Sequence, residues 1–144
     1  MITAVRSGES LKAEWKDVDL DNGTWTIPPE NQKVRPELIP ETDPFVIPLP
    51  DQAVTLFREL KAMAEQSPYV MASTRAKSGR REQKSLGHVL RWLLNLQNGE
   101  KPLLDIKPFS PHDLRRTAQT HLLDTLDVDE TIAERILNHK ILGV

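Results

Sequence analysis

Residues 110–116, with the sequence SPHDLRR, carry a full set of signals for the start of a helix. Ser110 is suited to the N-cap, the proline after it to the first helical position, and Asp113 to the carboxylate of a capping box. His112 and Arg115 are three residues apart, so both side chains lie on one side of the predicted helix, near its N-terminus. Because a helix N-terminus attracts anions, the segment predicts a site for a phosphate group.

The size and composition of the chain are ordinary for a globular protein. With 144 residues, 38% of them hydrophobic and 28% charged, it can form one domain or a fragment of one. It has no cysteine and no apolar run near the roughly 20 residues of a membrane span, so we expect a cytoplasmic protein without disulfides. Apolar residues at both ends, from Met1 to Val5 and from Ile141 to Val144, indicate a piece of a longer protein.

The hydrophobic pattern predicts an α+β fold that is mainly helical, with a small three-stranded antiparallel sheet. The Asn22-Gly23 turn indicates a hairpin, and Phe45 to Leu49 reads as an edge strand because it contains a proline. A first helix is expected from Ser7 to about Trp15, and a second from Asp51 to about Glu65, with Val54, Phe57, Leu60 or Lys61, and Ala64 following a helical period. A third begins at Ser85, carries Leu86, Val89, Leu90, Leu93 and Leu94 on its inward side, and stops at Asn98-Gly99. A fourth begins at Ser110, and a fifth runs from a capping box of Asp127 and Glu130 to a stop at Asn138.

Two predictions concern which helical residues are buried. In the helix that begins at Ser110, the inward side is expected to carry Leu114, Ala118, Leu122 and Leu126, with His121 as a core histidine. In the last helix, Ile132, Ile136 and Leu137 are expected to pack inward.

A net charge of -2 gives no overall attraction to nucleic acid, so DNA binding requires a local cluster of positive charge. Such a cluster occurs between residues 75 and 84, where one acidic residue stands among five basic ones. Glycine and serine within it predict a mobile loop, and a solvated run of charge is the alternative interpretation. The candidate DNA-binding residues are Arg75, Lys77, Arg80, Arg81 and Lys84.

The four histidines do not have the spacing of metal ligands. His112 and His121 are nine residues apart, on opposite sides of one helix, and there is no nucleophile elbow and no Walker loop. We therefore expect no metal and no cofactor. The remaining donors can stabilise the charge on a phosphoryl group, although Arg6 and His139 taken alone read as surface residues. These donors are Arg6, Lys33, His112, Arg115 and His139.

Four ordered motifs resemble the catalytic domain of the tyrosine recombinases, and most closely that of the prophage integrases. They are Val5-Arg6-Ser7-Gly8-Glu9, Trp25-Thr26-Ile27-Pro28 with a lysine soon after, Pro111-His112-Asp113-Leu114-Arg115-Arg116-Thr117, and Leu137-Asn138-His139-Lys140. The resemblance covers nearly the whole chain and implies site-specific DNA recombination and integration.

The resemblance also implies a role for each candidate. Arg6 and Arg115 would hold the non-bridging oxygens of the scissile phosphate. His112 would assist in proton transfer and phosphate binding, and His139 would be the last histidine donor. Lys33 would be the general acid toward the leaving 5′ oxygen, with Arg35 as a competitor because residues 36–45 look inserted. Arg116 shares a face with Arg115 but does not match the motif position, and Glu9 is expected to anchor the helix next to Arg6.

The family attacks DNA with a tyrosine that follows the last histidine by about ten residues or more, which gives a 3′-phosphotyrosyl intermediate. This sequence ends five residues after His139, and its single tyrosine, Tyr69, matches a structural part of the family pattern. We therefore expect residues 1–144 to be a catalytic-domain fragment, without the N-terminal DNA-binding domains and the nucleophile, and inactive alone.

The full-length protein would act as a tetramer on double-stranded attachment sites, without a membrane partner. One alternative is a non-catalytic DNA-binding relic or accessory module of the same fold. The other is a helical interaction domain, in which Arg6, His112, Arg115 and His139 would not converge.

Overall fold

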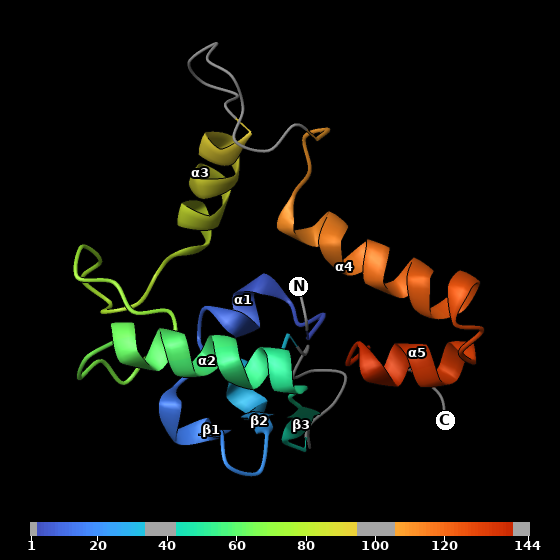
Figure 1. The fold of residues 1–144 in the computed structure, drawn as a ribbon, viewed down its shortest axis with the longest axis horizontal. Coiled ribbons are helices and arrows are strands. Elements are labelled where there is room, and N and C mark those ends of the chain that lie inside the picture. Colours follow the sequence, from blue (N-terminus) through green and yellow to red (C-terminus); the bar gives the residue numbers. More distant parts are fainter. Residues whose placement is uncertain (1–2, 34–42, 95–105, 140–144) are drawn as a thin grey trace. The chain divides into compact units, whose positions relative to one another are not determined.

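The computed structural model describes residues 3–33, 43–94 and 106–139 (Figure 1). The chain divides into two compact units, one of Thr3–Ser7 with Glu82–Val144 and the other of Gly8–Arg81. Mainly helical structure with a three-stranded antiparallel sheet confirms the expected α+β fold class. In the described ranges, no helix is both long and apolar enough to span a membrane.

The Gly8–Arg81 unit contains the sheet, whose strand order is β1 (Val18–Asp19), β2 (Thr24–Ile27) and β3 (Phe45–Pro48). The predicted hairpin joins β1 to β2. Its turn is closed by the Asp19 carboxylate, which accepts hydrogen bonds from the backbone N–H groups of Asp21 at 3.1 Å and Asn22 at 2.9 Å. Gly23 has a φ of 61°, a conformation that favours glycine. The predicted edge strand is confirmed as β3, which pairs with β2 alone among the described strands.

Helix α2 (Asp51–Met63) packs on this sheet through aromatic side chains (Figure 1). The Phe57 ring centroid lies 6.3 Å from that of Trp15, edge to face, and 5.9 Å from that of Trp25. The predicted inward face of α2 is confirmed, since its members are buried or half-buried between exposed neighbours. Its cap is Pro50, so that Asp51 is the first helical residue and not the cap that we predicted.

The first helix is much shorter than predicted. Helix α1 (Ser7–Ser10) stops well before Trp15, where a 3-10 turn, η1 (Trp15–Asp17), begins. The backbone between them pairs with a distant segment: Val70 N–H donates to the Ala13 carbonyl at 3.0 Å, and Trp15 N–H donates to the Pro68 carbonyl at 2.9 Å. A helix through these residues would need the same backbone groups, so the tertiary pairing ends it.

The other unit contains α3 (Gln83–Leu93), α4 (Pro111–Thr120), a π-helical turn η3 (His121–Thr125) and α5 (Glu130–Ile136). The predicted start of α4 is confirmed in full. The Ser110 hydroxyl accepts from Asp113 N–H at 3.3 Å, and the Asp113 carboxylate accepts from Ser110 N–H at 2.9 Å. After η3 the chain reverses, so that α5 runs back along α4 (Figure 1).

The predicted inward side of α4 is largely wrong. His121 is exposed, Leu114 is 37% exposed and Leu126 is 57% exposed. The buried side of α4 is centred on Arg115, whose guanidinium binds the carbonyls of Ala4 and Leu137, so Leu114 and His121 share an exposed side of the helix. The π-helical turn η3 begins at His121 and changes the spacing only of the residues that follow, which include Leu126.

The inward side of α5 is also different from the prediction. Ala133 and Leu137 are buried, whereas Ile132 is 52% exposed and Ile136 is 46% exposed. The helix begins later than expected, because Asp129 is the N-cap and accepts from two backbone N–H groups. Asn138 is the expected stop, with a φ of 50°.

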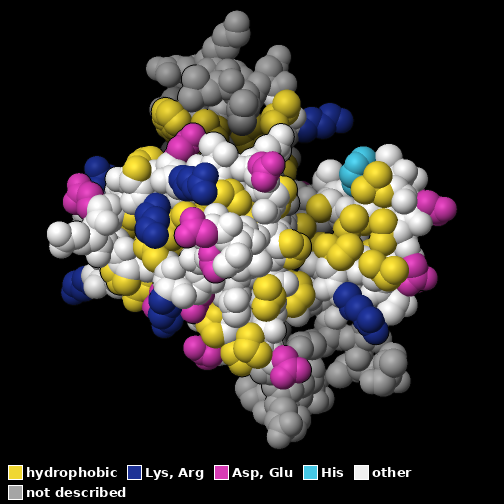
Figure 2. Space-filling view, turned by 60° about the horizontal axis from the view of Figure 1, so that its bottom comes forward, with side chains coloured by type: hydrophobic (Ala, Val, Ile, Leu, Met, Phe, Trp, Pro, Cys, Tyr) yellow, Lys and Arg dark blue, Asp and Glu magenta, His cyan; other side chains and the backbone are white. Residues whose placement is uncertain are grey.

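Helix α3 begins two residues before the predicted cap, Ser85, and its side chains are half-buried or exposed. Val89 is 44% exposed, whereas Leu94, just beyond the helix, is buried. Large apolar side chains are visible at the molecular surface in Figure 2. Predictions for residues 34–42, 95–105 and 140–144, which include Arg35 and the helix stop at Asn98-Gly99, lie outside the described residues.

Candidate functional site

Arg115 is a buried arginine that joins three distant segments. It is 4% exposed, its Nη1 donates to the Ala4 carbonyl at 2.6 Å, and its Nη2 donates to the Leu137 carbonyl. The neighbouring Arg116 is different, since its side chain is 72% exposed and lies 3.9 Å from the Asp113 carboxylate. The structure therefore separates two adjacent arginines that a helical pattern places near one face.

Arg6 binds the backbone carbonyl of Asn138, which directly follows the Leu137 carbonyl bound by Arg115. Its Nη1 donates to the Asn138 carbonyl at 3.2 Å, across 132 residues of sequence. The carbonyls of Leu137 and Asn138 follow the C-terminus of α5, where the helix dipole favours positive charge. Two guanidinium groups are thus attached to consecutive carbonyls, directly before His139.

His139 is held by Glu134. The imidazole Nδ1 lies 2.5 Å from Glu134 Oε2, and the backbone N–H of His139 donates to the Glu134 carbonyl at 2.8 Å. The other oxygen of the carboxylate, Oε1, accepts from Gln119 Nε2 at 2.8 Å. Sequence reasoning missed Glu134 and Gln119, because their contacts depend on the left-handed turn at Asn138 and on the pairing of α4 with α5.

His112 is exposed in the first turn of α4, one turn before Arg115. Its neighbour Asp113 has a pKa below the usual range. The Ser110 hydroxyl and backbone N–H cause most of this lowering by donating to the carboxylate, and the positive charges of Arg116 and His112 add to it. The capping box therefore holds the segment that carries His112 with an ionised carboxylate.

Lys33 belongs to the Gly8–Arg81 unit. It follows the 3-10 turn η2 (Pro29–Asn31), its side chain is exposed, and its backbone N–H donates to Glu9 Oε1 at 3.2 Å. Glu9 is 3% exposed, so a buried carboxylate fixes the backbone at Lys33. The next residue back, Gln32, braces the same stretch by donating from Nε2 to the carbonyls of Ile27 at 3.1 Å and Asp43 at 2.8 Å.

The basic segment, for which we predict a mobile loop, has a defined backbone arrangement. It forms a hairpin-like turn in which Ser73 N–H donates to the Gly79 carbonyl at 3.0 Å, and Arg81 N–H donates to the Met71 carbonyl at 2.8 Å. Tyr69 contributes to this turn, since its ring packs against Gly79 and has the Arg80 guanidinium 5.7 Å from its centroid.

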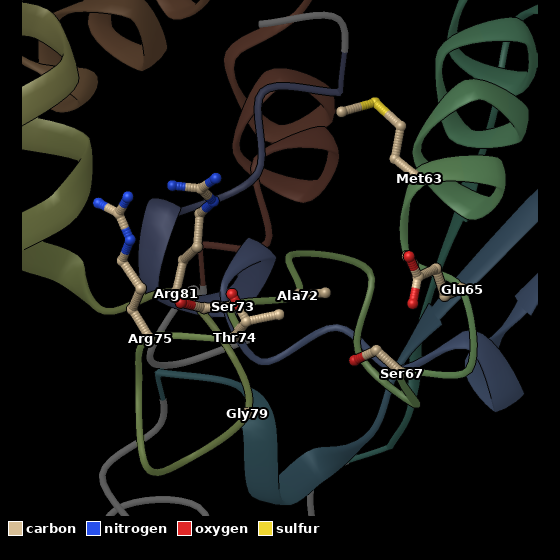
Figure 3. A pocket seen from close by; sticks show the side chains of 10 residues that line it. Met63, Glu65, Ser67, Ala72, Ser73, Thr74, Arg75, Gly79 and Arg81 are labelled. Carbon is tan, nitrogen blue, oxygen red and sulfur yellow. The ribbon is translucent and has the colours of Figure 1, made fainter.

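A hollow of about 620 Å³ lies beside this turn (Figure 3). The side chains of Arg75 and Arg81 extend in the same direction on one side of it, and Met63 and Glu65 lie on the other side. Of the remaining candidates, Lys77 is exposed in the turn, and Lys84 is exposed on α3, in the other unit. Lysine and arginine side chains are interspersed with acidic ones on the face seen in Figure 2.

Comparisons with known proteins agree with this fold. The sequence model of the phage integrase family matches residues 1–143 of this chain. XerA recombinase has a similar structure, with a TM-score of 0.67 at 22% identity, over 97% of this chain and 46% of the XerA chain. The Tn1549 transposon integrase, solved with circular intermediate DNA, gives a TM-score of 0.65 at 13% identity, over 96% of this chain and 49% of its own.

The chain spans about half the length of these two solved chains. A search of curated protein sequences gives no match. Over nearly the whole of this chain, the fold is that of these two solved recombination proteins, which agrees with the fold that the sequence motifs predicted. Because the family match extends over nearly every residue, the chain belongs to the phage integrase family.

Proposed function

We propose that residues 1–144 supply the phosphate-activating groups of an enzyme for site-specific DNA recombination and integration. The observation that carries the proposal is the attachment of Arg6 and Arg115 to consecutive carbonyls directly before His139. Membership of the phage integrase family supports the same assignment. Arg6, Arg115 and His139 are far apart in the sequence and are candidates for binding one phosphate group. This disfavours the alternative of a helical interaction domain, in which these residues would be scattered on the surface.

The chemistry follows from the charge of the reacting phosphodiester. Arg6 and Arg115 hold its non-bridging oxygens, because planar guanidinium groups can donate two parallel hydrogen bonds and stay charged at neutral pH. His112 and His139 donate to the same oxygens as negative charge develops on them.

Cleavage then requires a nucleophile and an acid. A tyrosine oxygen from outside residues 1–144 attacks phosphorus and forms the 3′-phosphotyrosyl bond, while the bond to the 5′ oxygen breaks and His112 takes the phenolic proton. Lys33 gives its proton to that leaving 5′ oxygen, so a 5′ hydroxyl is released. Rejoining reverses these steps with a different 5′ hydroxyl, and neither direction requires a metal ion.

The DNA backbone is proposed to bind along the basic segment. Arg75, Lys77, Arg80, Arg81 and Lys84 contribute phosphate contacts, which position the duplex without reading its sequence. The 144-residue chain binds double-stranded DNA weakly and loses affinity steeply with salt. Replacing Arg80 and Arg81 by alanine lowers the slope of log affinity against log salt by about 1 to 2, since each lost phosphate contact accounts for about 0.9. An unchanged slope removes this segment from the interface.

We propose further that residues 1–144 are one catalytic domain of a longer cytoplasmic protein, which acts as a tetramer on attachment sites. The test uses the full-length protein and a nicked attachment-site duplex. Wild type forms a DNA adduct that survives denaturant, and R6A or R115A loses it, whereas R116A keeps it. An adduct retained in R115A contradicts the proposed phosphate site.

A second candidate is a DNA-binding module without cleavage activity. One observation favours it: Tyr69, the single tyrosine of the sequence, is engaged by Gly79 and Arg80. The 144-residue chain alone is expected to form no adduct with nicked DNA. If the full-length protein binds attachment-site DNA with the same residues but forms no adduct either, the second candidate is correct.

A further inference from the structure

We infer that Glu134 is a positioning residue, which determines the nitrogen of the His139 ring that carries the proton and also the orientation of that ring. Gln119 holds the Glu134 side chain in place. The effect on catalysis rests on the function proposed above, whereas the effect on the ring does not. The family motifs in the sequence include His139 but neither of the other two residues.

The hydrogen-bond directions fix the proton. An ionised carboxylate only accepts hydrogen bonds, so at a separation of 2.5 Å the imidazole Nδ1 must be the donor to Glu134. In the neutral ring, Nε2 then carries no proton and is the acceptor; in the charged ring, Nε2 becomes a donor. Glu134 thereby assigns Nε2 as the nitrogen that exchanges a proton with a ligand.

The ring orientation is fixed because Glu134 holds His139 twice. The backbone N–H of His139 donates to the Glu134 carbonyl at 2.8 Å, and the side chains meet at the same time. The left-handed turn at Asn138 brings the histidine back toward the residue five positions earlier. The Asn138 carbonyl also accepts from Arg6, so the turn that directs the imidazole is the one that holds the first arginine.

Gln119 limits the freedom of the carboxylate. It is on α4, and its Nε2 donates to Glu134 Oε1 at 2.8 Å, so both oxygens of Glu134 are engaged. The Glu134 and His139 side chains are 24% and 31% exposed, which keeps the pair partly screened from water. A carboxylate held from a second helix has fewer rotamers, and a histidine held by it is better placed for reaction.

The first experiment measures the tautomer without DNA. The 144-residue chain is labelled with ¹⁵N in histidine, and H139Q identifies the His139 signals among those of the four histidines. At a pH where the titration shows neutral rings, wild-type His139 is expected as the Nδ1–H form. E134A moves it mainly to the Nε2–H form, and E134Q retains the Nδ1–H form because the amide oxygen still accepts.

The matched control is E130A, which removes an exposed carboxylate from the first turn of the same helix. It is expected to leave the His139 tautomer unchanged. Q119L is expected to broaden the His139 signals while keeping the tautomer. If E134A leaves the Nδ1–H form in place while its thermal unfolding matches that of E130A, the inference is wrong.

The second experiment uses the full-length protein on nicked attachment-site DNA. E134A is expected to lower the rate of adduct formation about 10-fold with little change in DNA affinity, and E134Q to recover most of it. A changed tautomer with an unchanged rate supports the positioning role and contradicts the part proposed for His139 in catalysis. Equal losses in E134A and E134Q, with the tautomer retained in both, contradict the positioning role.

Discussion

Replacing Arg115 by methionine is expected to open the contact between α4, the end of α5 and the N-terminal segment. Methionine keeps much of the apolar length of the side chain but donates nothing. The carbonyls of Ala4 and Leu137 then lose their hydrogen bonds from a buried, charged donor. Hydrogen bonds to charged groups contribute about 1.5 to 3 kcal/mol each, so two of them give about 3 to 6 kcal/mol.

The control is the same substitution at Arg116. That side chain is 72% exposed, and its ion pair with Asp113 is long at 3.9 Å. Exposed pairs of this kind contribute little to stability, because water and salt screen them. The two variants carry the same substitution at adjacent positions of α4, and only Arg115 is buried, so the comparison isolates the buried contacts.

Native-state hydrogen exchange measures the effect locally, through the opening free energy of peptides from α4 and α5. For R115M, amide exchange in these peptides should be at least roughly 100-fold faster, the equivalent of about 3 kcal/mol. For R116M it should be within about 3-fold of wild type. Similar protection in the two variants would refute the reasoning, since it would mean that the buried guanidinium adds nothing to the packing of α5.

Three further results are expected. Because hydrogen bonds from Ser110 lower the pKa of Asp113, the capping box is complete above the usual pKa of 3.8 and is lost as the pH falls through the lower pKa of the folded state. Amide hydrogen exchange in the first turn of α4 should become faster in that acidic range, and D113N should remove this pH dependence. Asn138 has a φ of 50°, so N138G should be tolerated and N138V should destabilise the chain by about 1 to 2 kcal/mol in urea unfolding; equal midpoints would contradict this. Gly23 has a φ of 61°, and an added methyl carbon would lie 3.2 Å from a backbone carbonyl oxygen, so G23A should cost about 1 kcal/mol or more, whereas G8A, at a position with open space, should not be destabilising.

Local hydrogen bonds made part of the fold predictable. The capping box of Ser110 and Asp113, the Asn22-Gly23 turn and the stop at Asn138 each depend on a few neighbouring residues, and all three are as predicted. Short motifs also singled out Arg6 and Arg115, and the structure attaches both to carbonyls that follow α5.

Non-local structure explains the errors. Periodicity assumes an uninterrupted α-helix, so it failed for Leu126, which lies beyond the π-helical turn. It also took Leu114 and His121 as the inward side, whereas the buried residue of α4 is Arg115, whose acceptors lie in distant segments. The end of α1 depends on pairing with residues some fifty positions later, which no local pattern contains. Glu134 was missed for the same reason: nothing in its own helix indicates that Gln119 and His139 will bind its two oxygens.

The carbonyls of Leu137 and Asn138 also determine when the arrangement can form during synthesis. Arg6 leaves the ribosome 132 residues before its acceptor, and Arg115 must wait 22 residues for one of its two. At about 5 to 20 residues per second, the interval for Arg6 is on the order of 7 to 26 s. Until then, the Arg6 side chain lacks this acceptor, so the proposed phosphate site is among the last features of these residues to form.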